Sequence, residues 1–185
     1  MKHIPLFTAV FMAFCVLALQ PGSARADSAA EISRSARTAL KTLYSINPAA
    51  RAVGEKAVAV LVFPRIIKGG FMVGGQVGNG ALFINGKTAG YYNTVAASYG
   101  FQAGLQKFSY AMFFMNRQAL GYLNKSGGWE VGSAPSLVVV DTGVARSLST
   151  TTLQNGIYVF FFGQKGLMGG ISLQGTKITR YTPSG

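Results

Sequence analysis

The side chains that could make or break covalent bonds are few in this chain. It holds one histidine, His3, and one cysteine, Cys15, and both lie within the first 26 residues. Residues 27–185 therefore cannot form a Ser-His-Asp triad, a Cys-His dyad, or a metal site built from thiolates or imidazoles. The five acidic residues all follow that opening segment: Asp27, Glu31, Glu55, Glu130 and Asp141.

Glu130 and Asp141 are the two carboxylates that could act as acid and base in glycoside hydrolysis. Neither their spacing nor their surroundings favour that role. Serine and lysine are plentiful, so a Ser-Lys dyad stays open, although no S-x-x-K motif marks one. We expect no enzymatic activity, no cofactor and no metal ion.

The stretch GKT (86–88) has the form of the end of a phosphate-binding P-loop. That motif places its first glycine five residues before the second, where this chain has Ala81, and Gly80 is one position off. The dipeptide Asn85-Gly86 is instead typical of a two-residue β-hairpin turn. We therefore predict a hairpin here and no nucleotide site.

The first 26 residues have the pattern of a cleaved signal peptide. Lys2 precedes an apolar run from Ile4 to Leu19, and the small residues Ala24 and Ala26 stand third and first before the expected cut. The run of about 16 residues is shorter than the roughly 20 that a membrane-spanning helix needs, and an uncleaved anchor is the alternative. We predict cleavage after Ala26 and export to the periplasm or the outer envelope.

The chain is strongly basic, with 17 lysines and arginines against 5 acidic residues and a formal charge of +12. Without Lys2 and Arg25, which would leave with the signal peptide, residues 27–185 carry +10. An exported protein meets little nucleic acid, so we predict none as a partner and expect anionic lipid headgroups or envelope polymers. A charge that serves only solubility is the alternative.

The segment AAEISRSARTALKTLYSI (29–46) has the periodicity of an amphipathic helix. One side is apolar, and the opposite side carries Arg34, Arg37 and Lys41. The apolar side could dock on a sheet or enter a membrane, and we favour docking. Asn47-Pro48 should end the helix, and shorter helices are predicted at 49–56 and 117–124.

From residue 57 onward, short apolar and β-branched runs alternate with glycine, asparagine and serine, which predicts strands. Gly163 and Gly166 bracket a further predicted tight turn. The fold class is α+β, a single domain with N-terminal helices followed by a largely antiparallel β-sandwich or barrel-like sheet. The predicted strands are 57–63, 71–77, 81–84, 108–115, 136–140, 157–162, 167–173 and 177–181.

Three blocks of the chain resemble the SYLF domain family. KGLMGGISLQGT (165–176) is similar to the K-G-L-F-x-G-[VI]-S-L-[EQ]-G-[ST] block of that family. AVAVLVFPRIIKGGFMVGGQVGNGAL (57–82) and SYGFQAGLQKFSYAMFFMN (98–116) resemble two others. Many members have Trp-Ser-x-Pro before the third block, where this chain has Tyr92 and Asn93. The resemblance extends from about Ala29 to Tyr181.

The resemblance implies a compact β-rich domain over residues 27–185, affinity for lipid, and no catalytic residues. Eukaryotic relatives bind phosphoinositide membranes and some bind actin, and exported bacterial members are described as lipid-binding. For an exported protein we retain affinity for anionic phospholipid and drop the two particular ligands.

We therefore predict non-enzymatic binding of anionic lipid or a membrane surface in the bacterial cell envelope. The alternative is a module that binds an envelope protein or polymer through its sheet and aromatic residues such as Tyr91, Tyr92 and Tyr99. The predicted lipid-binding residues are basic side chains of the first helix and its neighbourhood: Arg34, Arg37, Lys41, Lys56, Arg65, Lys68 and Lys165.

Overall fold

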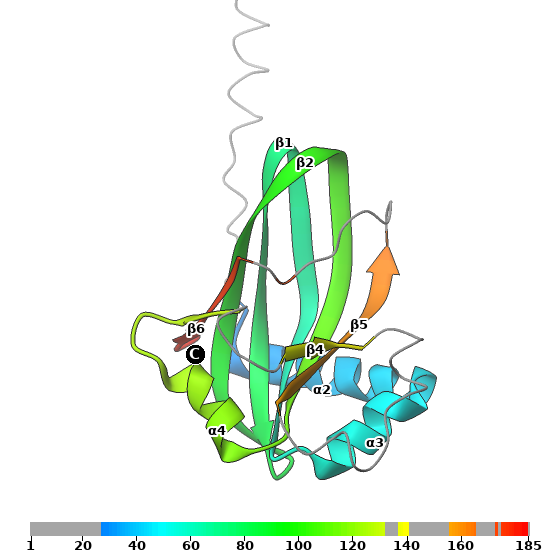
Figure 1. Cartoon of the computed structure of the whole chain (residues 1–185), viewed down its shortest axis with the longest axis vertical. Coiled ribbons are helices and arrows are strands. Elements are labelled where there is room, and N and C mark those ends of the chain that lie inside the picture. Colours follow the sequence, from blue (N-terminus) through cyan, green and yellow to red (C-terminus); the bar gives the residue numbers. More distant parts are fainter. Residues whose placement is uncertain (1–26, 132–136, 141–155, 166–172, 174, 185) are drawn as a thin grey trace, which may run out of the picture.

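The computed structural model describes residues 27–131, 137–140, 156–165, 173 and 175–184, with no side-chain description for 71–73 and 98–104. The predicted signal peptide lies outside these residues. Two helices at the start of the described chain lie against a tall, curled sheet (Figure 1). The fold class is α+β, as predicted.

Helix α2 (Ala29–Ile46) begins and ends where the sequence predicts. The side chain of Ser28 accepts a hydrogen bond from the backbone N–H of Glu31, which caps the first turn. Asn47 takes an extended backbone conformation before proline and ends the helix. Its side chain also accepts from the N–H of Ala50 at 3.0 Å, so one residue ends α2 and caps α3 (Pro48–Lys56).

Strands β1 (Ala59–Ile84) and β2 (Lys87–Phe114) form one long antiparallel hairpin. Asn85 and Gly86 connect them with φ angles of 50° and 72°. Two consecutive residues with positive φ are typical of the type I′ turn, whose twist matches that of the flanking strands. The predicted Asn-Gly hairpin is confirmed.

The predicted separate strands 57–63, 71–77 and 81–84 are wrong as a division, because all three belong to β1. The pairing with β2 continues past the glycines between them, with a register shift between Gly70 and Met72. Pro64 stands where the register shifts between Phe63 and Ile66, so the N–H that proline lacks is not needed for the ladder.

Glycine lets β1 pack against itself. A Cβ on Gly78 would stand 2.6 Å from the carbonyl oxygen of Arg65, and one on Gly80 would stand 2.5 Å from that of Val62. The second half of β1 therefore passes backbone to backbone across the first half, which no larger residue would permit. This close approach curls the sheet.

Four further strands complete the six-stranded sheet of the described residues, in the order β3-β6-β2-β5-β4 with β1 paired to β2. All pairings are antiparallel except that of β4 with β5. A short helix, α4 (Arg117–Leu120), continues into a 3₁₀ turn, η1 (Gly121–Asn124), at the predicted place. The strands are β3 (Trp129–Glu130), β4 (Leu137–Val139), β5 (Ile157–Lys165) and β6 (Thr176–Tyr181).

The tight turn predicted between Gly163 and Gly166 is wrong, because β5 continues through Lys165. Gly163 has a φ of +62° and lies beside the register shift between Lys107 and Ser109 of β2. The glycine therefore accommodates a bulge inside the strand. Most of the predicted strand 167–173 lies outside the described residues.

The sheet buries apolar side chains on both faces. One face packs Phe63, Tyr110 and Trp129 with α4 and η1. The other face receives Ile32, Ala36 and Leu43 of α2. The apolar side of α2 is thus docked on the sheet, as favoured from the sequence, and each large side chain buried this way contributes about 1.5–3 kcal/mol.

Candidate functional site

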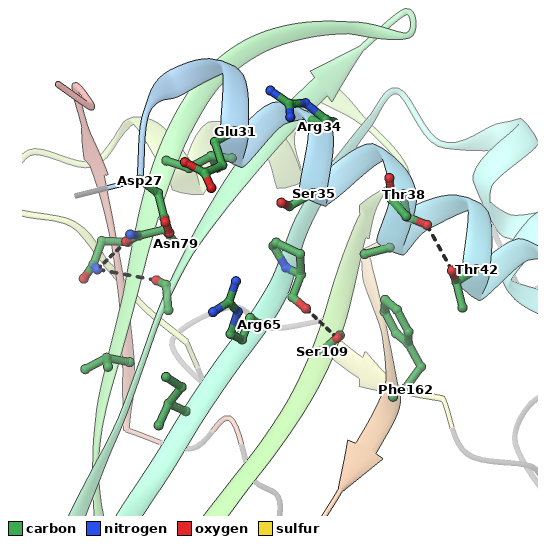
Figure 2. A pocket seen from close by; sticks show the side chains of 18 residues that line it. Asp27, Glu31, Arg34, Ser35, Thr38, Thr42, Arg65, Asn79, Ser109 and Phe162 are labelled. Atoms are coloured by element: carbon green, nitrogen blue, oxygen red, sulfur yellow. Dashed lines mark hydrogen bonds between the residues drawn. The ribbon is translucent and has the colours of Figure 1, made fainter. Parts of the chain in front are cut away.

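A groove of about 680 Å³ runs between α2 and the sheet. Helix α2 provides one wall, and residues of β1, β2 and β5 provide the other. Figure 2 shows Arg65 extending from β1 into the groove and Arg34 on the helix at its rim. The structure thus brings together two of the predicted lipid-binding residues, although they are 31 positions apart in the chain.

The groove also carries two carboxylates, Asp27 and Glu31, from the beginning of α2 (Figure 2). They offset the two arginines in formal charge. Several of its hydroxyl and amide groups already have protein partners. The hydroxyl of Ser109 donates to the carbonyl of Pro64 at 2.8 Å, and the amide of Asn93 donates to Asn79 Oδ1 at 3.0 Å. The groove is therefore a weak candidate for an anion site.

Arg37 is held by the protein itself. Its guanidinium donates to the carbonyl of Gly86 at 2.7 Å and to Thr88 Oγ1 at 3.4 Å. It also lies 4.8 Å from the ring centroid of Phe83. Arg37 therefore ties α2 to the β1–β2 turn, and its predicted role in lipid binding competes with this structural one.

Lys41 borders a second hollow of about 450 Å³ between α2 and α3. Arg51 contributes to the same hollow and donates to the carbonyl of Tyr44 at 3.3 Å. Burial, followed by the nearby Glu55 carboxylate, raises the pKa of the Tyr44 hydroxyl, so this hydroxyl stays protonated at neutral pH. Arg51 is thus a basic neighbour of Lys41 that does not belong to the seven predicted lipid-binding residues.

The remaining predicted residues are spread over the surface. Lys56 is exposed at the end of α3, and Lys68 is half-buried on β1. Lys165 is exposed at the end of β5, directly opposite Lys107 of β2. The seven residues therefore form no single cluster. The position of Lys107 opposite Lys165 was not predicted, because it depends on a bulge in β5 that the sequence pattern does not reveal.

The aromatic surface of the alternative interpretation does not form as predicted. Tyr92 is buried in the core, with an exposed fraction of 2%. Tyr91 is half-buried, and its hydroxyl is hydrogen-bonded to that of Ser33 at 2.9 Å. The side chain of Tyr99 lies outside the description. Alternation along β2 turns Tyr92 inward, a direction that depends on which face of the strand is covered.

The carboxylates provide no recognisable catalytic arrangement in the described part of the chain. Glu130 is exposed on β3, and Asp141 lies outside the described residues. Within the same ranges, no group of three or more His, Cys, Asp or Glu side chains could hold a metal ion. None of the helices described is both long and apolar enough to span a membrane.

A comparison with protein families finds similarity over the second half of the chain. A family model described as "Ysc84: Las17-binding protein actin regulator" matches residues 95–183. The matched segment begins within β2 and ends after β6, so it includes β5 and β6 but not α2, α3 or β1. A search of the curated proteins finds no match to the chain.

Proposed function

We propose that this chain, which belongs to the SYLF family represented by the matching Ysc84 model, binds anionic lipid surfaces without catalysing a reaction. That family consists of binding modules rather than enzymes. The proposed location is the bacterial cell envelope. This location rests on the signal-peptide pattern of residues 1–26 and the predicted cleavage after Ala26. Residues 27–185 would then be the mature, single-domain protein.

One observation carries the proposal. The apolar side of α2 is buried on the sheet, so the helix presents its opposite side, with Arg34 and Lys41, to the surroundings. Arg51 and Lys56 of α3 are exposed beside it. Each basic side chain close to an anionic membrane contributes roughly 1 kcal/mol. A few such contacts predict weak binding that salt reverses.

Co-sedimentation with vesicles tests this function. Wild-type protein should bind phosphatidylcholine vesicles that contain phosphatidylglycerol, bind pure phosphatidylcholine poorly, and dissociate as salt is raised. The double variant Arg34→Glu/Lys41→Glu should bind several-fold less, because it replaces attraction by repulsion. Equal binding to neutral and anionic vesicles, or to neither, would contradict the proposal.

A matched control separates local from total charge. Arg117→Glu/Lys125→Glu changes the net charge by the same amount, but both positions lie with α4 and η1 on the other face of the sheet. This variant should retain most of the binding. Arg37 is unsuitable for this test because its substitution would also remove the hydrogen bond to Gly86.

Binding of an envelope protein or polymer is the second candidate. It is favoured by the description of the matching family model, which names a protein that binds another protein. This candidate would be supported against the first if the protein captured an envelope component from an extract but bound vesicles of no composition.

A further inference from the structure

The helices leave part of the sheet uncovered. β1 and β2 extend well beyond α2 and α3 (Figure 1). Four large apolar side chains of these two strands are exposed: Ile67 at 38%, Val77 at 50%, Val95 at 47% and Leu105 at 60%. Exposed apolar side chains that gather on one surface commonly mark an interaction site.

These four side chains lie on one face. Val77 pairs directly with Val95, and alternation from Ala81 puts Val77 on the face that α2 covers further down. Leu105 stands opposite Gly69, and Ile67 opposite Lys107, on that same face. Ile67 and Val77 also both line the groove beside α2, so the two halves of β1 bring them together.

A pair of cations borders this apolar area at the β5 edge. Lys107 and Lys165 are exposed and occupy directly opposed positions on β2 and β5. Like charges in this arrangement repel each other, so the pair costs stability in the free protein. Of the described carboxylates, Asp27 and Glu31 line the groove that Ile67 and Val77 also line, and Glu55 lies in α3. Glu130 on β3 stands opposite Lys177 rather than opposite Lys107 or Lys165.

The opposite edge differs in its charges. There Lys177 of β6 stands directly opposite Glu130 of β3, so a carboxylate offsets the cation. At the β5 edge the strand pairing instead places two lysines, Lys107 and Lys165, opposite each other, with Ile67 paired to Lys107. An anion that approached Lys107 and Lys165 would relieve their mutual repulsion.

We propose that Ile67, Val77, Val95, Leu105, Lys107 and Lys165, called the sheet patch, form the surface that enters the headgroup region of an anionic bilayer. This inference rests on the proposed function and assigns its main contact to the sheet rather than to α2. The apolar side chains enter the interface, and the two lysines reach phosphate groups with long stems that stay in apolar surroundings. The patch matches a bilayer because it joins an apolar area to a cationic edge.

Contact through the sheet patch changes how binding to anionic vesicles is expected to depend on salt. Contact through α2 alone would be electrostatic, and salt would abolish it. Contact through the patch includes apolar burial, which salt does not screen. A fraction of the binding to anionic vesicles should therefore survive high salt.

Full-length variants test the patch by vesicle co-sedimentation. Leu105→Ser/Val95→Thr should lower binding on the order of tenfold and abolish the salt-resistant fraction. Ile46→Ser is the matched control, since Ile46 has an exposed fraction of 62% at the end of α2, outside the patch. Lys107→Glu/Lys165→Glu should weaken binding more than Arg117→Glu/Lys125→Glu. Unchanged circular dichroism and melting temperature confirm folding.

Fluorescence gives an independent readout. Tryptophan emission of Leu105→Trp should shift to shorter wavelength on addition of phosphatidylglycerol vesicles, whereas Ile46→Trp should not shift. The native Trp129 is fully buried and provides a constant background. A patch variant that binds like wild type, together with no shift at position 105, would overturn the patch and leave the proposed function intact.

Two other outcomes also count against the patch. If wild-type protein ignores anionic vesicles altogether, the proposed function fails, and the patch fails with it. If Leu105→Ser converts a wild-type dimer into monomers, the patch is covered by a second copy of the chain. Loss of binding in the patch variant alone supports the inference.

Discussion

The guanidinium of Arg37 donates a 2.7 Å hydrogen bond to the carbonyl oxygen of Gly86, which joins the first helix to the turn between the two longest strands. The positive φ of Gly86 allows the turn, and the carbonyl then points to the helix. A residue that the sequence suggests as a lipid contact is thus also part of the protein's own architecture.

Arg37→Met should therefore destabilise the fold by about 1 kcal/mol, because the hydrogen bond to Gly86 and the contact with the Phe83 ring are lost while the apolar stem is retained. Chemical denaturation measures this difference. Arg34→Met is the control, and its effect on the free energy of unfolding should be small. Equal effects at both positions would contradict the role assigned to Arg37.

Gly80→Ala should destabilise the protein by about 1–3 kcal/mol or prevent folding, because the added methyl group meets the backbone of Val62. Gly75→Ala is a matched control in the same strand, where the nearest atom to an added Cβ is the Ala96 carbonyl oxygen at 3.5 Å. Thermal unfolding of the two variants should differ clearly. A tolerated Gly80→Ala would show that β1 does not pack so closely against itself.

Because Tyr110 is buried, we expect the folded protein to lose stability in alkali. Complete burial raises the pKa of its hydroxyl, which donates to Thr94 Oγ1 at 2.8 Å. The pKa in the unfolded chain is about 10, so the unfolded state loses its proton first, and the stabilisation present below pH 10 is lost as the pH rises further.

The measurement is the free energy of unfolding between neutral pH and pH values above 10. Tyr110→Phe should be less stable than wild type near neutral pH by about 1 kcal/mol, because Thr94 loses its donor. It should also lose less stability in alkali. A wild-type curve that stays flat above the pKa of free tyrosine would contradict this account. Burial raises the pKa of Tyr92 and Tyr158 in the same direction, so part of the slope should remain in the variant.

Expression of the whole chain in a bacterium tests the signal peptide. Mass spectrometry of the exported protein should give Asp27 as the first residue, because Ala24 and Ala26 suit signal peptidase. Ala26→Phe should block cleavage and leave the longer form bound to the inner membrane. An unprocessed wild-type protein would favour the anchor that we gave as the alternative.

Local signals predicted much of the fold correctly. The helix 29–46 was found because its apolar spacing and the Asn47-Pro48 stop act within a few residues of one another. The turn at Asn85-Gly86 was found for the same reason. Glycine in β1 misled the division into strands, since the pattern does not distinguish a glycine that ends a strand from one that admits a neighbouring backbone.

The candidate site was less predictable. The side of α2 that carries Arg34, Arg37 and Lys41 follows from helical periodicity, but their separate surroundings do not. Arg34 and Arg65 line the same groove, and Arg37 donates to Gly86, although these residues are far apart in the chain. The sheet patch was missed entirely, because exposure of Val77 or Leu105 depends on where the helices stop.

The sequence by itself determined the helices and the main turn, the basic charge and the shortage of catalytic side chains, because each depends on residue type or on neighbours along the chain. Only the tertiary structure decided which side chains meet and which remain exposed. Register shifts at Pro64 and Gly163 set the pairing of the long strands, and docking of α2 decided which part of the sheet is covered. Such relationships join residues far apart in the chain, so no local pattern encodes them.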